Sequence, residues 1–427
     1  MSRSVVVAVW LAVLPSMLQA QPASPSADAP GRVTFAQAID LALQRNVTVQ
    51  EAAEEILRAQ GLLREATANI LPSVSGSLAT TTLNEGEQFE GAVTTARNQV
   101  VATVTVSGLA YAPVQWALRV QAADNVHVAE LAAADIKRQI AQATAQAYLA
   151  IIARSRVVDA DVRARDVARA HYELAKQLRE AGGGSVLNEL RAQQSFSGDD
   201  VLVQQSELDL YRAEEALGVL LERDGPVAAA DEPPLDVPAD LEQAVQAMPD
   251  VRSDLRLAVA REQAATRVAN DSWKDWLPSV GALFEPEYTT PQTLFQPNYT
   301  WTLEFVGKMT FFDGGFRRAQ KSERQALVRE ATLARRGLLT QARSDVRAAR
   351  EALRLALAAQ RSARAAADQA ARVLDIVNIS FKAGAVTNIE VIDAQRVARD
   401  ADTDAAVAED QVRQARLALL IALGRFP

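Results

Sequence analysis

Few residues of this sequence have the types and spacing that catalysis requires. Asp313-Gly314-Gly315 has the small residues of a phosphate-cradling loop. No Lys-Ser or Lys-Thr pair follows it and no parallel-strand pattern precedes it, so we interpret it as a turn from a strand into a helix. Glu285 and Glu287 have no partner acid or base nearby and are interpreted as rim or lumen residues of a strand pair.

Other reactive side chains are scarce. The chain has no cysteine, which rules out disulfides and thiolate metal sites. Its two histidines, His127 and His171, stand singly in helical patterns and are interpreted as surface or packing residues. The sequence therefore predicts no enzyme activity, no cofactor and no metal site.

Two further carboxylates, Glu390 and Asp393, stand near the predicted start of the last helix. They stand three residues apart in a helical pattern that begins after a break at Gly384, so they share one helix face. In an assembly with threefold symmetry each would become a ring of acids, and such rings attract cations and disfavour anions. From the residues alone, two ordinary surface acids at a solvated helix end are the simpler interpretation.

These acids belong to a pattern of strands and very long helices. Residues Thr300 to Phe311 alternate with period two: apolar Trp301, Leu303 and Phe305 face one side, and polar residues face the other. This pattern predicts a strand with one apolar face. A strand pair with a loop at residues 85–91 is predicted earlier in the chain, from Ser73 to Asn84 and from Asn98 to Ala110.

The chain is a duplicated unit. LPSV occurs at residues 71–74 and again at 277–280, and each copy precedes two strand patterns and a long helical pattern. The sequence thus divides into a first repeat at residues 34–223, a Pro-rich linker at 224–240 and a second repeat at 241–427. Each repeat is predicted to begin with a single helix, over residues 35–63 and 241–276.

Each repeat also contains a long helical hairpin. Val114 to Ala181 contains no proline or glycine, and a helix of that length spans about 100 Å. Glycines break each hairpin at a tip. The first tip is Ala181-Gly182-Gly183-Gly184-Ser185, before a helix at residues 187–222. The second is Gly384-Ala385-Val386-Thr387, between helices at 316–383 and 389–423.

The N-terminus predicts export. Residues 1–20 contain a basic Arg3, a short apolar run and a small-residue ending, as in a secretory signal peptide, and residues 21–33 read as a flexible lead-in. No later apolar run reaches the ~20 residues of a membrane helix, so a membrane crossing would use strands. Four strands cannot close a barrel, whereas three chains would supply twelve. The net charge of −8 gives no reason to expect nucleic acid.

In combination these motifs resemble the TolC-like outer-membrane efflux proteins. The resemblance is carried by the duplicated LPSV, by FDGG at residues 312–315 and by FKAGAVTNIEVIDAQ at 381–395. It implies a mainly α chain with membrane β-structure. Three chains would form a twelve-stranded outer-membrane barrel, four strands from each, continued by a long helical coiled-coil barrel through the periplasm of a Gram-negative bacterium, with residues 224–240 in a belt around its middle.

The resemblance also implies a function and partners. The family is a passive exit duct that contacts outer-membrane lipid and docks an inner-membrane transporter through a periplasmic adaptor, using the hairpin tips. Glu390 and Asp393 would line the entrance. Val386 stands where better-known members have a basic gate residue, and Asn188 and Arg191 hold the matching positions of the first tip, where Arg191 would partly neutralise the acids.

Two other functions fit parts of the pattern. A periplasmic adaptor also has a long helical hairpin, but it would flank a single hairpin with many short strands. An exported coiled-coil scaffold without a membrane role would need the long helices alone. The exported cargo and the class of transporter are not encoded in any motif of this chain.

Overall fold

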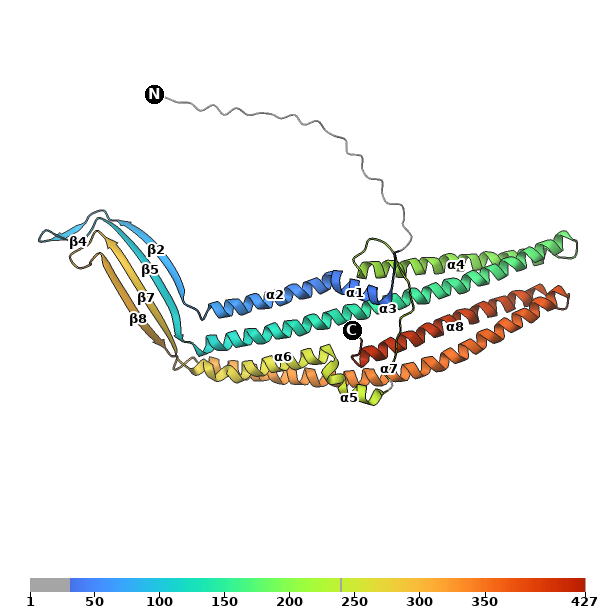
Figure 1. The fold of residues 1–427 in the computed structure, drawn as a ribbon. Coiled ribbons are helices and arrows are strands. Elements are labelled where there is room, and N and C mark those ends of the chain that lie inside the picture. Colours follow the sequence, from blue (N-terminus) through green and yellow to red (C-terminus); the bar gives the residue numbers. More distant parts are fainter. Residues whose placement is uncertain (1–30, 239, 427) are drawn as a thin grey trace, which may run out of the picture.

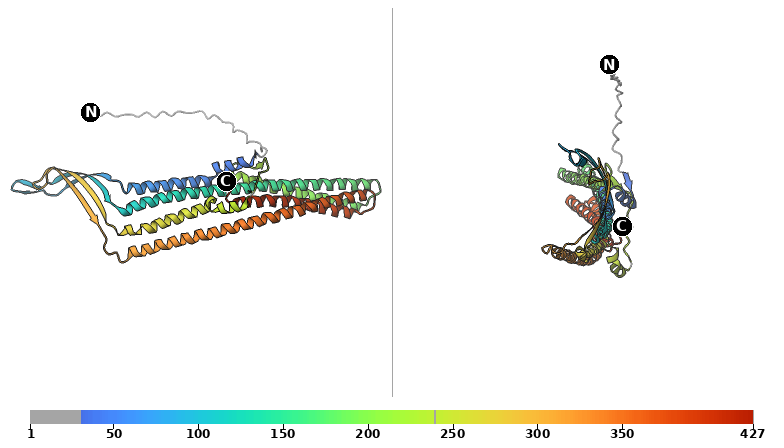
Figure 2. Two further views of the ribbon diagram at one scale, coloured as in Figure 1. Left: turned by 60° about the horizontal axis from the view of Figure 1, so that its bottom comes forward. Right: turned by 90° about the vertical axis from the view of Figure 1, so that its left-hand side faces the viewer.

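The computed structural model of this chain describes residues 31–238 and 240–426, so the predicted signal peptide lies outside the described residues. The molecule is long and narrow, with a four-stranded sheet at one end and the tips of two helical hairpins at the other (Figure 1). Seen end-on, its helices follow a curved layer rather than a closed bundle (Figure 2). Such a layer leaves much of each helix exposed.

The two repeats have the same order of elements, as the sequence predicts. The first repeat comprises α1 (Phe35–Arg45), α2 (Val47–Ala68), β2 (Ser73–Thr82), β3 (Glu87–Phe89), β4 (Ala92–Thr95), β5 (Asn98–Tyr111), α3 (Pro113–Glu180) and α4 (Val186–Leu220). The second comprises α5 (Leu241–Val251), α6 (Ser253–Asn270), the 3-10 helix η1 (Asp271–Trp276), β7 (Ser279–Thr290), β8 (Tyr299–Lys308), α7 (Phe316–Lys382) and α8 (Asn388–Ala422).

The two strand pairs join into one antiparallel sheet in the order β2-β5-β7-β8. The repeats meet where β5 pairs with β7, for example at Val106 opposite Phe284. Strands β2 and β8 therefore form the two edges. The predicted loop at residues 85–91 contains β3, which forms a short hairpin with β4 beyond the end of the main sheet (Figure 1).

The last strand is shorter than the alternation predicts. Strand β8 ends at Lys308, whereas the sequence pattern continues to Phe311. The reason is local, because side-chain hydrogen bonds replace the strand ladder. Arg317 donates to the carbonyl of Thr310 at 2.7 Å, and the Asp313 carboxylate accepts hydrogen bonds from the backbone N–H groups of Gly315 and Arg317. These contacts turn the chain from β8 into α7.

The first helix of each repeat is broken, whereas the sequence pattern predicts one continuous helix. In the first repeat, buried Asn46 caps α2 by accepting a hydrogen bond from the Thr48 N–H, and its amide donates to the carbonyl of Leu220. In the second, Arg252 has an extended backbone between α5 and α6, and its guanidinium binds Asp254. A polar side chain with a local partner thus defines each break.

Short strands at the middle of the molecule were not predicted. Of the expected flexible lead-in at residues 21–33, residues 21–30 lie outside the described residues, and Gly31–Val33 forms strand β1, which pairs in parallel with β6 (Val227–Ala229) from the linker. Both segments are fixed to α3 by Tyr148, which is fully buried. Its hydroxyl lies 3.1 Å from the carbonyl oxygen of Val33 and accepts hydrogen bonds from the N–H groups of Ala230 and Asp231.

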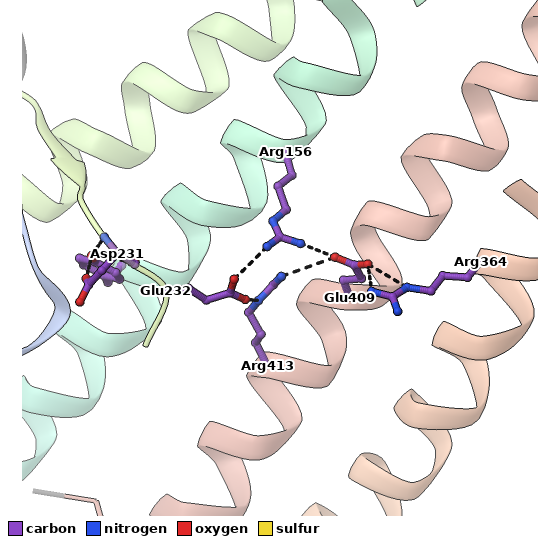
Figure 3. Close-up of polar contacts among 7 residues, drawn as sticks. Arg156, Asp231, Glu232, Arg364, Glu409 and Arg413 are labelled. Carbon is purple, nitrogen blue, oxygen red and sulfur yellow. Dashed lines mark hydrogen bonds and ion pairs between the residues drawn. The ribbon is translucent and has the colours of Figure 1, made fainter. Parts of the chain in front are cut away.

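Charged side chains extend this attachment to the other long helices. As Figure 3 shows, Glu232 of the linker lies between Arg156 of α3 and Arg413 of α8. Glu409 of α8 contacts both of these arginines and also Arg364 of α7. Arg413 lowers the pKa of Glu232, and although burial raises the pKa of Glu409, its arginine partners more than offset this, so both glutamates stay ionised at neutral pH. The network links three helices and the linker.

The apolar core is concentrated at this same level. Three clusters of buried residues form where α1, α5 and the linker pack against the long helices. Towards the tips the buried positions of α3 are mostly alanines, such as Ala160, Ala168 and Ala175, which allow close helix packing with little apolar volume. The middle therefore contributes most of the burial that stabilises a single chain.

Among the described residues, none of the helices combines the length and hydropathy that a bilayer-spanning helix requires.

We expect Tyr148→Phe to destabilise the protein by about 2 kcal/mol, because the hydroxyl's hydrogen bond to the Val33 carbonyl is lost and the backbone N–H of Asp231 loses its acceptor. The measurement is the free energy of unfolding of the purified protein by denaturant titration. Tyr172→Phe is the matched control, since Tyr172 lies on the same helix, half-buried and stacked on Phe196. An equal loss in both variants would contradict the bracing role of the Tyr148 hydroxyl.

Candidate functional site

The candidate site is the pair of hairpin tips at the end of the molecule opposite the sheet (Figure 1). Both tips have the same backbone. In the first, Gly182 has φ 80° and the N–H of Gly183 donates to the carbonyl of Leu178. In the second, Gly384 has φ 74° and the N–H of Ala385 donates to Ser380. This helix ending needs a residue in the left-handed region, which explains the glycines.

Glu390, one of the predicted entrance acids, is held at the start of α8. Its carboxylate accepts hydrogen bonds from both the backbone N–H and the hydroxyl of Thr387. These bonds lower the pKa of Glu390, so its charge persists to more acidic pH than that of an ordinary glutamate. Glu390 therefore stabilises the end of its own helix and still carries a negative charge at the tip.

The second predicted acid, Asp393, lies one turn further along α8 and is exposed. Its carboxylate pairs with Arg396 of the same helix at 2.8 Å. Asn188 and Arg191 lie at the matching positions of α4, where Arg191 is exposed and Asn188 half-buried. The fold thus brings all four predicted residues to the same end of the molecule, and the cation nearest to Asp393 is Arg396 rather than Arg191.

Val386 stands at the position of the missing basic residue and is half-buried. It lines a pocket of about 340 Å³ between the two tips, together with Leu174, Leu178 and Phe381. Gly184 also lines this pocket, and a Cβ there would lie 2.7 Å from the backbone nitrogen of Arg179. The two tips of one chain are therefore in close contact around an apolar centre.

Sequence reasoning missed the residues that join the tips. His171 and Asn388 are both buried and lie 2.8 Å apart, between Nε2 and Oδ1. Asn388 also donates to the backbone carbonyl of Asn188 at 3.3 Å. The packing role predicted for His171 agrees with its burial, whereas its partner lies 217 positions away and no local pattern signals it.

Among residues 31–238 and 240–426, the histidines and acids form no group of three or more that could hold a metal ion. What the arrangement offers is a charged rim and an apolar contact between helix ends. Those are properties of a passage or a docking surface.

Comparison with solved structures identifies the fold. The fold matches that of the outer membrane protein VceC from Vibrio cholerae with a TM-score of 0.77, 19% sequence identity and coverage of 91% of this chain and 96% of that one. The CmeC outer membrane channel of Campylobacter jejuni gives 0.75 at 15% identity, with coverage of 92% and 86%. The MtrE channel of Neisseria gonorrhoeae gives 0.76 at 16%, with coverage of 91% and 88%.

The fold is thus that of the TolC-like outer-membrane channels, as the sequence predicts. In addition, residues 244–425 match the family described as outer membrane efflux protein. No curated protein matches the sequence. The match to this family lies within the second repeat and the end of the chain.

We expect Gly384→Ala to loosen the second tip by about 1 kcal/mol, because an alanine side chain is strained at positive φ. Amide hydrogen exchange at the ends of α7 and α8 should become faster. Gly337→Ala in the interior of α7 is the contrast, since a Cβ there meets no atom within 4 Å and alanine favours helix. Faster exchange at the tip in both variants would argue against the positive-φ explanation.

Proposed function

We propose that three copies of this chain form a passive channel from the periplasm across the outer membrane. Strands β2 and β8 at the two edges of the sheet carry this proposal. An open strand edge is not tolerated in lipid, because its N–H and C=O groups would lack partners. Pairing β8 of one copy with β2 of the next removes every edge and gives a closed barrel of twelve strands.

The side chains of β8 suit such a barrel. Trp301, Leu303 and Phe305 share one face and are each more than half exposed in the single chain, at 61%, 54% and 65%. Thr302 and Glu304 occupy the other face. The apolar face would contact lipid, while the polar face would line a water-filled lumen. The long hairpins would then continue the passage through the periplasm.

The periplasmic part of the proposed assembly would be built from the two repeats and their linker. Residues 34–223 and 241–427 would contribute equivalent parts of the wall, and residues 224–240, with β1 and α5, would form the belt around its middle. An inner-membrane transporter would deliver the substrate, and a periplasmic adaptor would dock at the tips, residues 181–185 and 384–387. No bond is made or broken in this mechanism, and the cargo would be selected by the transporter.

The alternatives account for less of the structure. A periplasmic adaptor has one hairpin flanked by many short strands, whereas this chain has two equivalent hairpins that share one four-stranded sheet. A soluble scaffold would have no use for a strand whose apolar face is exposed. The family match favours the channel over both.

At the entrance, threefold symmetry would convert Glu390 and Asp393 into two rings of acids, with Asn188 and Arg191 as modulators. Rings of carboxylates at a narrow opening raise the local concentration of cations. Arg191 adds positive charge at the same end of the molecule. We therefore propose a cation preference that the arginine weakens.

We expect the double variant Glu390→Gln with Asp393→Asn to lose most of its preference for cations. The measurement is the reversal potential under a salt gradient in planar bilayers. Glu130→Gln is the matched control, because Glu130 is an exposed acid far from the tips, in the half of α3 that lies nearer the sheet. Unchanged selectivity in the double variant would remove these acids from the pore mouth.

The assembly itself is tested by extracting the mature protein from membranes in mild detergent. Light scattering should give the mass of a trimer, and negative-stain images should show a tapering tube with a helical part of about 100 Å. A monomer that stays soluble without detergent would contradict the channel proposal and favour the exported coiled-coil scaffold.

A further inference from the structure

The contact between the two tips of one chain is made by uncharged side chains from three helices. His171 of α3 is 5% exposed and Asn388 of α8 is 3% exposed. Nε2 of His171 lies 2.8 Å from Oδ1 of Asn388, and Nδ2 of Asn388 donates to the carbonyl of Asn188 in α4. Phe381 of α7 packs edge-on against the His171 ring, with centroids 5.2 Å apart. All four tip helices therefore meet at His171 and Asn388.

This geometry defines the protonation of the histidine. The Asn388 amide nitrogen is the only group of that side chain that can donate to the Asn188 carbonyl, so its oxygen faces His171. Nε2 of His171 must then carry the hydrogen and donate it to Asn388. A second proton on Nδ1 would place a positive charge in a buried site, which is unfavourable.

No neighbouring acid offsets such a charge. Burial lowers the pKa of His171, and the hydrogen bond to Asn388 only partly opposes this shift. Charged residues that flank these contacts in sequence are exposed or already paired. They are Arg169 and Glu173 on α3, Glu189 on α4 with its partner Arg179, Lys382 on α7 and Glu390 on α8 with its partner Thr387. His171 is therefore neutral while the tips are together.

We propose that His171 and Asn388 form an uncharged latch that holds the two tips of one subunit together and keeps the channel entrance narrow. The inference rests on the proposed channel function. It assigns the closing interaction to a buried hydrogen bond within one subunit. Val386 is apolar and cannot supply an ionic contact at the position where the resemblance places a basic gate residue.

The latch has a definite response to pH. Separating the tips exposes His171 to water, where its pKa returns to the ordinary value of about 6.5. The separated form then binds a proton more readily than the latched form, so acid favours separation. The latch is at full strength above about pH 6.5 and weakens as the pH falls below it. By pH 5.5 the equilibrium in each subunit shifts towards separation by up to about tenfold.

The test compares single-channel conductance in planar bilayers at pH 7.5 and pH 5.5. The wild-type conductance should rise at pH 5.5. His171→Gln keeps an N–H donor without titrating, so its conductance should stay low at both pH values. Asn388→Asp places a carboxylate against the ring, which favours the protonated histidine, so its conductance should not rise at pH 5.5. His127→Gln removes the other histidine of the chain, which is exposed, and should behave as wild type.

A second measurement does not depend on channel activity. The chain has no native cysteine, so spin labels on Ala181→Cys and Ala383→Cys report the distance between the tips in detergent. This distance should lengthen at pH 5.5 in the otherwise wild-type protein and stay constant in His171→Gln. If the labels move apart at pH 5.5 but the protein forms no channels in bilayers, the latch is supported and the channel proposal fails. The latch would be overturned if the protein forms channels whose tip distance and conductance do not change with pH. It would also be overturned if both change with pH to the same extent in His171→Gln.

Discussion

A buried hydroxyl at the middle of the molecule is the interaction on which the rest of this chain depends. Helices of 68 and 67 residues, packed mainly through alanine, bury little apolar surface and need a lateral brace. Tyr148 supplies one, because its hydroxyl binds the backbone of both β1 and the linker. The ion network of Glu232 and Glu409 then connects that brace to α7 and α8. Burial of the hydroxyl raises the pKa of Tyr148 to about 12, so it remains a donor at physiological pH.

Much of the fold could be predicted because its signals are periodic and repeated. Alternation at Trp301, Leu303 and Phe305 indicated a strand, and the long stretches without glycine or proline indicated the helices. The duplicated LPSV aligned the two halves. What escaped prediction depends on single contacts between distant residues. Strand β1 has only three residues and pairs with residues about two hundred positions later, and no periodic pattern can arise over three residues.

The candidate site also contains some features that the sequence predicts and others that it does not. Glycines mark both tips in the sequence, because only a residue that tolerates positive φ ends a helix in that manner. Glu390 and Asp393 were singled out by the resemblance to the TolC-like family, because their spacing alone favours ordinary surface acids. Their immediate partners, Thr387 and Arg396, are local and could have been anticipated from capping and from i,i+3 pairing. The contact of His171 with Asn388 could not, since histidine in an alanine-rich helix has no signature and its burial depends on how the second hairpin packs.

The matched lengths of the corresponding helices in the two hairpins have an evolutionary consequence. Helices α3 and α7 differ by one residue, and α4 and α8 both have 35. An insertion in one hairpin alone would shift its tip by about 1.5 Å per residue and rotate its packing face by about 100°. Length can therefore change only in steps that preserve the helical period, and in both halves together. Duplication of one ancestral unit would have supplied that match at the outset, and selection would since have kept the two halves from diverging in length while their sequences drifted apart.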